Sequence, residues 1–526
     1  MYRFLRDKSI PTTRRASKVC NTLITAHSNE ELKIYDTALT NTISLFRYPF
    51  ETIDPYLKDH PEFVMANVLG AIVSILSGIG NVDEYYQRIQ DALSQDPNQK
   101  DFTKNEHLYS RVIASLRCNR IRYAINTLEA ILMNDPTDVL AIHILSYLYP
   151  MIGDSQGMYG SISRTWSYWG IAVACDNLMP GYRAQTLLDL GFYEDAESAG
   201  MHSLSGNPSD IRSIHSVSQV METQGRTRES LRFLRETQGD WTNENVDYHQ
   251  GSILEHHLKS HIWSLYLQVK QTEYAIGQLD ETLLREEDMM KGESQDGWST
   301  NQDLISSDHV NDYVNVLYRC ELAGEGMGDR WNRVSKLLDC THKQLLTPMD
   351  YFHRGILFSV TGEDEKMRNL LSDERKRECD ELWKQLDLPE TKIKWCHVQG
   401  DDRMDAISDN TMIQSSIDAI IQLNNENYVK AADTLFTLLP RFGEMGGELR
   451  DRELLLLSTF KALDGSGNYQ VLERMLNDFT TRNPRRADCF HLLSDCVKKM
   501  GYITKAETLK DYAYNLGYEQ GGNNAS

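Results

Sequence analysis

A group of histidines in the middle of the chain has the residue types and spacing of a metal or acid–base site. Four of them fall within thirteen residues, at His249, His256, His257 and His261. On a helix, His257 and His261 would lie one turn apart on the same face, as metal-binding histidine pairs do. His215 and Glu222 are seven residues apart and would share a face of an earlier helix. A site that combines His215, Glu222, His257 and His261 is therefore one hypothesis.

The opposing hypothesis is that these histidines supply polar packing between helices and surface hydrogen bonds. The chain has no HExxH motif, no CxxC pair and no glycine-rich phosphate loop of the Walker or GxGxxG type. On this interpretation the chain has no catalytic residue, no metal site and no cofactor.

An aromatic patch is a candidate binding surface. Trp166, Tyr168 and Trp169 lie within four residues of one another. Such side chains either line a groove or pocket or belong to the core. We keep these three residues as the candidate interaction residues.

The elements that position these residues are predicted by a recurring spacing. A small or apolar residue is followed by Pro twelve positions later, at Ala124 and Pro136, Ala196 and Pro208, Leu472 and Pro484, and more loosely Tyr85 and Pro97. This is typical of the second helix of a tetratricopeptide-type pair, in which the small residue packs between helices and Pro ends the helix. The clearest copy runs from Gly191 to Pro208. We therefore predict an all-α fold, an α-α superhelix of tetratricopeptide-like repeats.

Local signals set the expected boundaries. Ser28 with Glu31 forms a capping-box pattern that begins the first helix. We predict a lead-in over 1–27, a first repeat array over 28–290 and an exposed loop over 291–312, which is rich in Ser, Asp, Asn and Gly. A second array over 313–516 and a disordered tail over 517–526 complete the division.

Composition limits the partners and the compartment. The net charge of −21 disfavours nucleic acids and anionic membranes, which bind to clustered Lys and Arg. The uncharged stretch from Phe63 to Val82 has the length of a membrane span, but its Asn, Ser and Gly residues favour a buried repeat helix. Nine scattered cysteines are typical of a reduced, cytoplasmic protein. The basic first twenty residues leave a mitochondrial transit peptide as the alternative.

Several segments are similar to the tetratricopeptide repeat protein 38 family. The similarity extends from about Leu5 to about Leu456 and is carried by Leu5-Arg6-Asp7, Ser28-Asn29-Glu30, Tyr35-Asp36, Pro61-x-Phe63-Val64-Met65, Phe192-Tyr193-x-Asp195-Ala196-Glu197, Leu317-Tyr318-Arg319, Gly328-x-Arg330-Trp331, Gly446-Gly447 and Arg450-Asp451. The resemblance implies a helical-repeat fold and no particular activity. The family carries additional histidines at the positions of Gln219 and Met221 and in the segment from Trp263 to Leu265, so the chain departs from it at the histidine cluster.

A stack of helix pairs leaves a groove lined by the first helix of each pair, and such grooves hold peptides or partner helices. Our first prediction is therefore a non-enzymatic scaffold that binds a protein or peptide and is free to form a homo-oligomer. The alternative is an enzyme or metal-binding protein that uses the histidine and glutamate set. The scaffold predicts a long groove without buried titratable groups, whereas the alternative predicts that the four residues converge.

Overall fold

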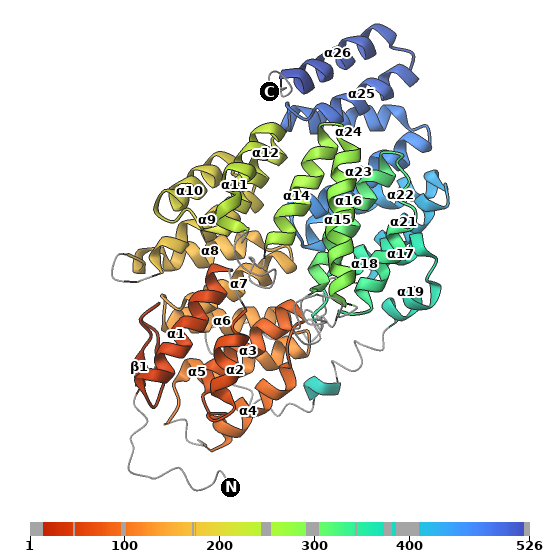
Figure 1. The fold of residues 1–526 in the computed structure, drawn as a ribbon. Coiled ribbons are helices and arrows are strands. Elements are labelled where there is room, and N and C mark those ends of the chain that lie inside the picture. Colours follow the sequence, from red (N-terminus) through yellow and green to blue (C-terminus); the bar gives the residue numbers. More distant parts are fainter. Residues whose placement is uncertain are drawn as a thin grey trace.

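The computed structural model describes residues 14–45, 48–95, 101–170, 173, 175–242, 254–290, 305–341, 345–372, 381–384 and 410–519. Most of these residues are helical (Figure 1). The predicted all-α fold is confirmed. His249, most of the predicted loop and residues 520–526 lie outside the described residues.

The helices of the first half run in order along the chain. They are α1 (Asn29–Ser44), α2 (Phe50–Leu57), α3 (Val64–Ser77), α4 (Val82–Ser94), α5 (Lys104–Arg117), α6 (Ile121–Asn134), α7 (Val139–Met151), α8 (Ser155–Thr165), α9 (Met179–Asp189), α10 (Tyr193–Gly206), α11 (Ile211–Thr223), α12 (Thr227–Glu236) and α13 (Gln238–Trp241). Two short 3₁₀ helices, η2 (Trp166–Tyr168) and η3 (Asp176–Leu178), connect α8 to α9.

The second half continues in the same way. Its helices are α14 (Glu255–Gln268), α15 (Thr272–Met290), α16 (Ser307–Leu322), α17 (Arg330–Leu338), α18 (Pro348–Thr361), α19 (Asp364–Leu370), α21 (Asn410–Asn424), α22 (Tyr428–Leu438), α23 (Leu449–Gly465), α24 (Tyr469–Arg482), α25 (Ala487–Lys499) and α26 (Ile503–Glu519). The 3₁₀ helix η6 (Leu439–Met445) connects α22 to α23.

Several helix ends follow directly from the sequence signals. The Ser28 hydroxyl accepts a hydrogen bond from the Glu31 backbone N–H and caps α1. α6 ends at Asn134, before Asp135 and Pro136, because Pro has no backbone N–H to continue the helix. α10 and α24 likewise end two residues before their prolines.

Consecutive helices pair and the pairs stack into a superhelix. Ala196 of α10 is fully buried, and a Cβ atom added at Gly200 would lie 2.6 Å from Val217 of α11. Small residues on α10 therefore let the next helix approach closely. The packed faces form two large apolar clusters, one mainly from residues 20–182 and one from residues 211–506.

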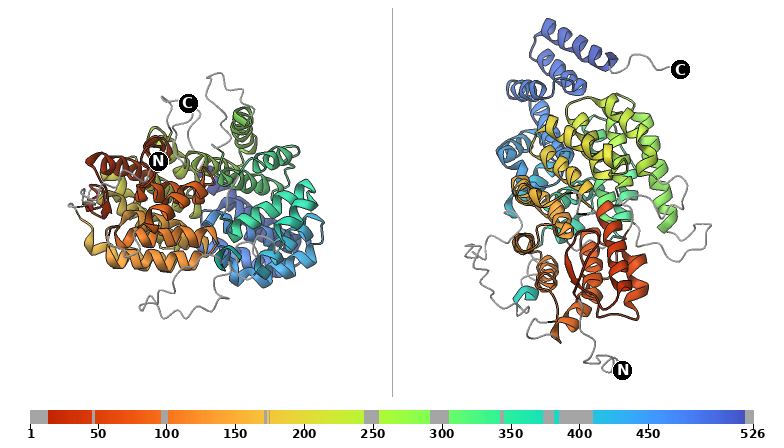
Figure 2. Two further views of the ribbon diagram at one scale, coloured as in Figure 1. Left: turned by 90° about the horizontal axis from the view of Figure 1, so that it is seen from below. Right: turned by 90° about the vertical axis from the view of Figure 1, so that its left-hand side faces the viewer.

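The superhelix closes on itself rather than leaving an open groove along its whole length. A Cβ atom at Gly153, after α7, would lie 2.1 Å from the carbonyl oxygen of Gly443 in η6. One at Gly446 would lie 2.4 Å from the carbonyl oxygen of Met151. The last helices, α25 and α26, lie at the opposite end of the molecule from the first helices (Figure 2), so the closure is made by the contact between the end of α7 and η6. This contact brings the start of α23 to the inner surface of the first half.

The predicted boundaries differ from the structure at three places. The lead-in contains a small antiparallel sheet, β1 (Arg14–Ala16) with β2 (Leu23–Thr25), which Glu106 of α5 holds by accepting from the Thr25 N–H at 2.9 Å. Residues 307–312, predicted as exposed loop, form the first turns of α16, and Ser307 and Asp312 are buried there. Residues 517–519, predicted as tail, end α26.

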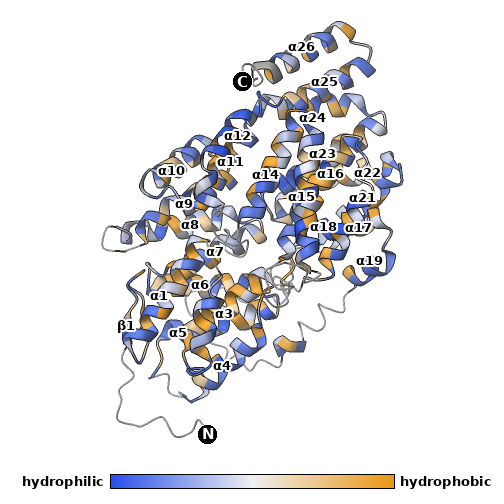
Figure 3. Ribbon diagram, viewed as in Figure 1, coloured by the Kyte–Doolittle hydropathy of each residue, from blue (hydrophilic) through white to orange (hydrophobic). Residues whose placement is uncertain are grey.

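The uncharged stretch after Phe63 forms α3, which is buried almost throughout and largely apolar in Figure 3. Among the described helices, none combines the length and the hydropathy required to span a bilayer. The burial of α3 agrees with its predicted place as a repeat helix.

Candidate metal centre

The inner helices present polar side chains to one another. On α11, Arg212, His215, Gln219 and Glu222 follow a spacing of three and four residues and so form one stripe. All four are buried. This polar stripe faces α14 and the start of α23, which carry the remaining residues of the site.

Three imidazoles point their Nε2 atoms at one position. Nε2 of His215 lies 3.2 Å from Nε2 of His261 and 3.2 Å from Nε2 of His257. The third distance, between His257 and His261, is 3.3 Å. Oε2 of Glu448, at the N-cap of α23, lies 3.1 Å from His257 Nε2, 3.4 Å from His215 Nε2 and 3.8 Å from His261 Nε2. The four atoms form the corners of a nearly regular tetrahedron.

Carboxylates that contact Nδ1 of two of the rings fix the direction in which the Nε2 atom of each ring points. His261 Nδ1 lies 2.6 Å from Glu222 Oε2, and His257 Nδ1 lies 2.9 Å from Asp312 Oδ1. Each Nδ1–H donates to its carboxylate, which leaves Nε2 as the acceptor in the neutral ring. Metal-binding histidines carry this carboxylate partner in most metalloproteins.

The charges of the cluster are strongly coupled. Burial alone would raise the pKa of Glu222, but the charge and hydrogen bond of His261 outweigh it and lower that pKa to about 2. Burial would lower the pKa of His257, but Asp312 and Glu448 hold it well above the usual value. Burial dominates at His215, whose pKa is lowered. The three carboxylates thus favour positive charge at the cluster, either as protons on the histidines or as a bound cation.

Further contacts hold the carboxylates in place. Arg450 forms a buried ion pair with Asp312 at 2.6 Å and donates to Ser260 Oγ at 2.8 Å. Glu448 caps α23 by accepting from the Asp451 backbone N–H, and Gln219 Nε2 donates to Glu448 Oε2 at 3.3 Å. The position of Glu448 therefore depends on α23 as well as on α11.

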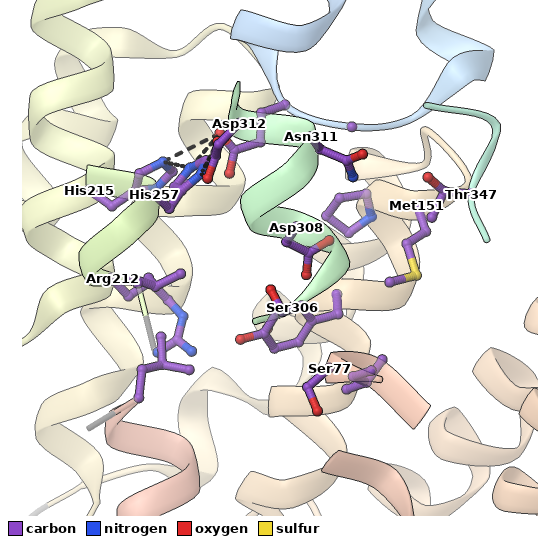
Figure 4. Close-up of a pocket in the computed structure, with 18 of the residues that line it drawn as sticks. Ser77, Met151, Arg212, His215, His257, Ser306, Asp308, Asn311, Asp312 and Thr347 are labelled. Atoms are coloured by element: carbon purple, nitrogen blue, oxygen red, sulfur yellow. Dashed lines mark hydrogen bonds and ion pairs between the residues drawn. The ribbon is translucent and has the colours of Figure 1, made fainter. Parts of the chain in front are cut away.

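The site opens into a cavity of about 290 Å³. His215, His257 and Glu448 line it, whereas His261 is fully buried behind them. Figure 4 shows His215 and His257 at one end of the cavity, beside Asp312. The side chains of His257 and Glu448 are 20% and 30% exposed, so small molecules can reach this face of the cluster.

A second histidine group lies behind the first. His256 and His309 stack with ring centroids 4.2 Å apart, and His309 Nδ1 lies 3.1 Å from Glu286 Oε1. His256 Nδ1 lies 3.4 Å from Asp312, the carboxylate that also contacts His257. The stacked arrangement resembles a hydrogen-bonded pair around Glu286 more than three ligands aimed at one point.

Of the four residues in the sequence hypothesis, the structure brings three together as possible ligands. His215, His257 and His261 converge, whereas Glu222 lies behind His261. Glu448 and Asp312 carried no recognisable signal in the sequence. The only local signal at Glu448 is its place as an acidic residue at the N-terminus of α23. Acidic residues are common at helix N-termini, so this signal does not predict a metal ligand.

The aromatic patch lies elsewhere and does not line the cavity. Trp166 and Tyr168 are 38% and 60% exposed, while Trp169 packs against the core of the first half. Arg183 lies over the Trp166 ring, 5.1 Å from its centroid. The interaction role of these three residues stays a prediction.

No protein-family model matches the chain, and its membership of the tetratricopeptide repeat protein 38 family stays a prediction from the sequence.

Proposed function

We propose that the protein binds one divalent transition-metal ion, zinc, through His215, His257, His261 and Glu448, and acts as a metal-dependent enzyme on a small molecule in the cavity. The observation that carries the proposal is the convergence of three Nε2 atoms within 3.3 Å of one another. Two of these rings have their other nitrogen bonded to a buried carboxylate.

The spacing suits zinc. A tetrahedron with metal–ligand bonds of about 2.05 Å has edges of about 3.3 Å, and zinc takes four nitrogen and oxygen ligands in this geometry. The distances between the candidate ligand atoms range from 3.1 to 3.8 Å. Without a metal ion, Asp312 and Glu448 hold the pKa of His257 well above its usual value, so its Nε2–H can donate to Glu448 Oε2 at 3.1 Å, and zinc must displace that proton to bind.

One feature favours a catalytic over a structural site. Four protein ligands fill the tetrahedron, as they do in structural zinc sites, but zinc can expand to five ligands, so a small molecule can bind the ion where a cavity reaches it. Here the cavity reaches the side of the cluster formed by His257 and Glu448. A zinc ion at this position would supply Lewis-acid chemistry, such as polarisation of a carbonyl group.

The scaffold function is still a prediction that no observation tests, as are a protein or peptide partner, a homo-oligomer and a cytoplasmic location. The buried titratable cluster is the feature that the scaffold hypothesis did not predict, and it supports the metal-dependent alternative.

Metal analysis of the purified full chain tests the proposal. The wild-type protein, loaded with zinc and dialysed against metal-free buffer, should retain about one zinc ion per chain by elemental mass spectrometry. The double variant His257→Ala, His261→Ala should retain none, because half of the ligand set is removed. His202→Ala, an exposed histidine of α10, is the matched control and should retain zinc as the wild type does. Equal zinc content in the double variant and the wild type would refute the metal site.

A further inference from the structure

The cavity contains a second built site, one helical turn from the histidine cluster. We infer that the cavity takes a small carboxylate whose anionic group binds Arg212 and whose apolar body lies toward the N-terminal helices. This inference rests on the proposed function only where it places a second polar group of the ligand beside the histidines. The anion site itself is formed by other residues.

Arg212 is a buried charge for which the described residues supply no anionic partner. Arg212 is 3% exposed, and it lines the cavity. Among the described residues, no carboxylate lies within the 4.0 Å that defines an ion pair with its guanidinium. Buried arginines are normally paired, because an uncompensated charge in the interior is strongly unfavourable. The guanidinium is therefore placed where a ligand can supply the missing charge.

The neighbours of Arg212 orient the guanidinium without neutralising it. The guanidinium carbon lies 3.9 Å from the centroid of the Tyr182 ring, and Nη2 lies 3.4 Å from His143 Nδ1. Burial, with the charge of Arg212, lowers the pKa of His143 well below its usual value, so this ring is neutral. Stacking on Tyr182 fixes the plane of the guanidinium, which also contacts Tyr147 and lines the cavity where a ligand can reach it.

The charges around the cavity favour a carboxylate over a phosphate. Asp308 also lines it and forms no ion pair with Arg212, and Asp189 lines it too, where burial raises the pKa of its carboxyl group to about 7. Figure 4 shows Asp308 and Ser306 across the cavity from Arg212. A single guanidinium between acidic neighbours balances one negative charge, whereas a phosphate dianion would be repelled by those acids. A planar carboxylate also matches the two parallel donors of the fork.

The other end of the cavity is apolar. Leu45, Val73, Leu76 and Met151, from the ends of α1, α3 and α7, line it together with Tyr48. The volume of about 290 Å³ is close to the lower limit for small-molecule sites, which measure about 300–1,000 Å³. The ligand is thus a compact carboxylate with an aliphatic or aromatic body.

The spacing along α11 relates this anion site to the metal centre. Arg212 and His215 are three residues apart on one face of the helix, so their Cβ atoms are about 5–6 Å apart. A ligand held by Arg212 through its carboxylate can therefore place a second polar group, a few bonds away, beside the histidines. N-acylated amino acids have this arrangement, with an amide carbonyl next to the carboxylate.

The test compares two ligands that differ in charge alone. Calorimetric titration measures binding of N-acetylphenylalanine and of its primary amide, N-acetylphenylalaninamide, to the zinc-loaded full chain and to the chelator-treated chain. The acid should bind about 10- to 100-fold more tightly than the amide, because a charge-assisted hydrogen-bonded pair is lost with the amide. Inorganic phosphate should compete with the acid weakly.

Variants assign the preference to Arg212. Arg212→Met should abolish the preference for the acid, while Arg212→Lys should retain part of it. Arg232→Met, an exposed arginine of α12, is the control and should behave as the wild type does. The comparison of acid with amide on the wild-type chain is independent of whether Arg212→Met folds.

The outcomes separate this inference from the proposed function. Equal binding of acid and amide, or tighter binding of phosphate than of the acid, would overturn the carboxylate site. An acid preference that survives in Arg212→Met but is lost when zinc is removed would also overturn it, because the carboxylate would then bind the metal. An Arg212-dependent preference in a chain that retains no zinc would support the anion site and refute the metal function.

Discussion

At the level of single residues, Glu222 shows how a side chain that does not reach the converging atoms can still control the site. It is buried, and it lies 2.6 Å from His261 Nδ1. The carboxylate both orients the ring and increases the electron density at Nε2. Its charge, rather than its shape, should therefore set much of the affinity of the site for zinc.

The variant Glu222→Gln tests this idea. Glutamine keeps an oxygen that can accept from His261 Nδ1–H but loses the negative charge. We expect zinc affinity to fall by about 10- to 100-fold, the usual range for such outer partners, as measured by competition with a chromophoric chelator. Glu281→Gln, on the exposed face of α15 where Glu281 pairs with Arg285, removes the same charge and should have no effect. An unchanged zinc affinity in Glu222→Gln would show that Glu222 does not tune the site.

The sequence identified the histidines but not their carboxylate neighbours. His257 and His261 are a turn apart on α14, so helical periodicity alone placed their rings together. Glu448 is 191 residues beyond His257, and no local pattern relates the two. Long-range pairs of this kind depend on how the superhelix curves, which periodicity does not encode.

At the level of elements, the connection from η6 to α23 determines where Glu448 lies. Gly446 adopts φ 67°, and its Cα faces the carbonyl oxygens of Pro150 and Met151 at the end of α7. Glycine is required there for two reasons, the left-handed backbone and the lack of space for a Cβ atom. Glu448 follows two residues later, so this contact positions the fourth candidate ligand.

We expect Gly446→Ala to lower both the free energy of unfolding and the zinc affinity. The added methyl group would lie 2.4 Å from the Met151 carbonyl oxygen, and the connection must shift to relieve it. Gly467→Ala is a close control, because Gly467 has φ 76° but no atom within 4 Å of an added Cβ. Both variants carry strain from a positive φ, which is larger at Gly446 because its ψ of −151° lies in a region that glycine alone normally adopts, and only Gly446→Ala adds the clash. Chemical denaturation and chelator competition measure the two effects, and equal behaviour of the two variants would contradict the argument.

Local signals predicted the helices well wherever a cap or a proline marked the end. Ser28 and Pro136 are such cases, because each acts on neighbouring backbone groups. The start of α16 was wrongly predicted as loop, because Ser and Asp residues there suggest exposure. Asp312 is instead buried by its ion pair with Arg450, a partner far away in the sequence.

At the level of the whole molecule, the candidate metal centre connects the two halves of the superhelix. Its histidines come from α11 and α14, and Glu448 comes from the start of α23. A bound ion would therefore bridge segments that otherwise meet through close backbone contacts such as that between Gly153 and Gly443. Because such a site exists only in the folded chain, zinc binding should stabilise the closed superhelix as a unit.

We expect the thermal midpoint of the chelator-treated protein to rise with added zinc in proportion to the logarithm of its concentration. A ligand that binds only the folded state adds about 2.7 kcal/mol at a free concentration one hundred times its Kd. Differential scanning calorimetry measures the shift, and His202→Ala should show it in full. The double variant His257→Ala, His261→Ala should show none, since its remaining ligands, His215 and Glu448, cannot form a tetrahedral site. A midpoint that rises equally in the double variant would mean that zinc stabilises the chain elsewhere. A midpoint that does not move in the wild type would mean that the three imidazoles are held together by protons and ion pairs alone.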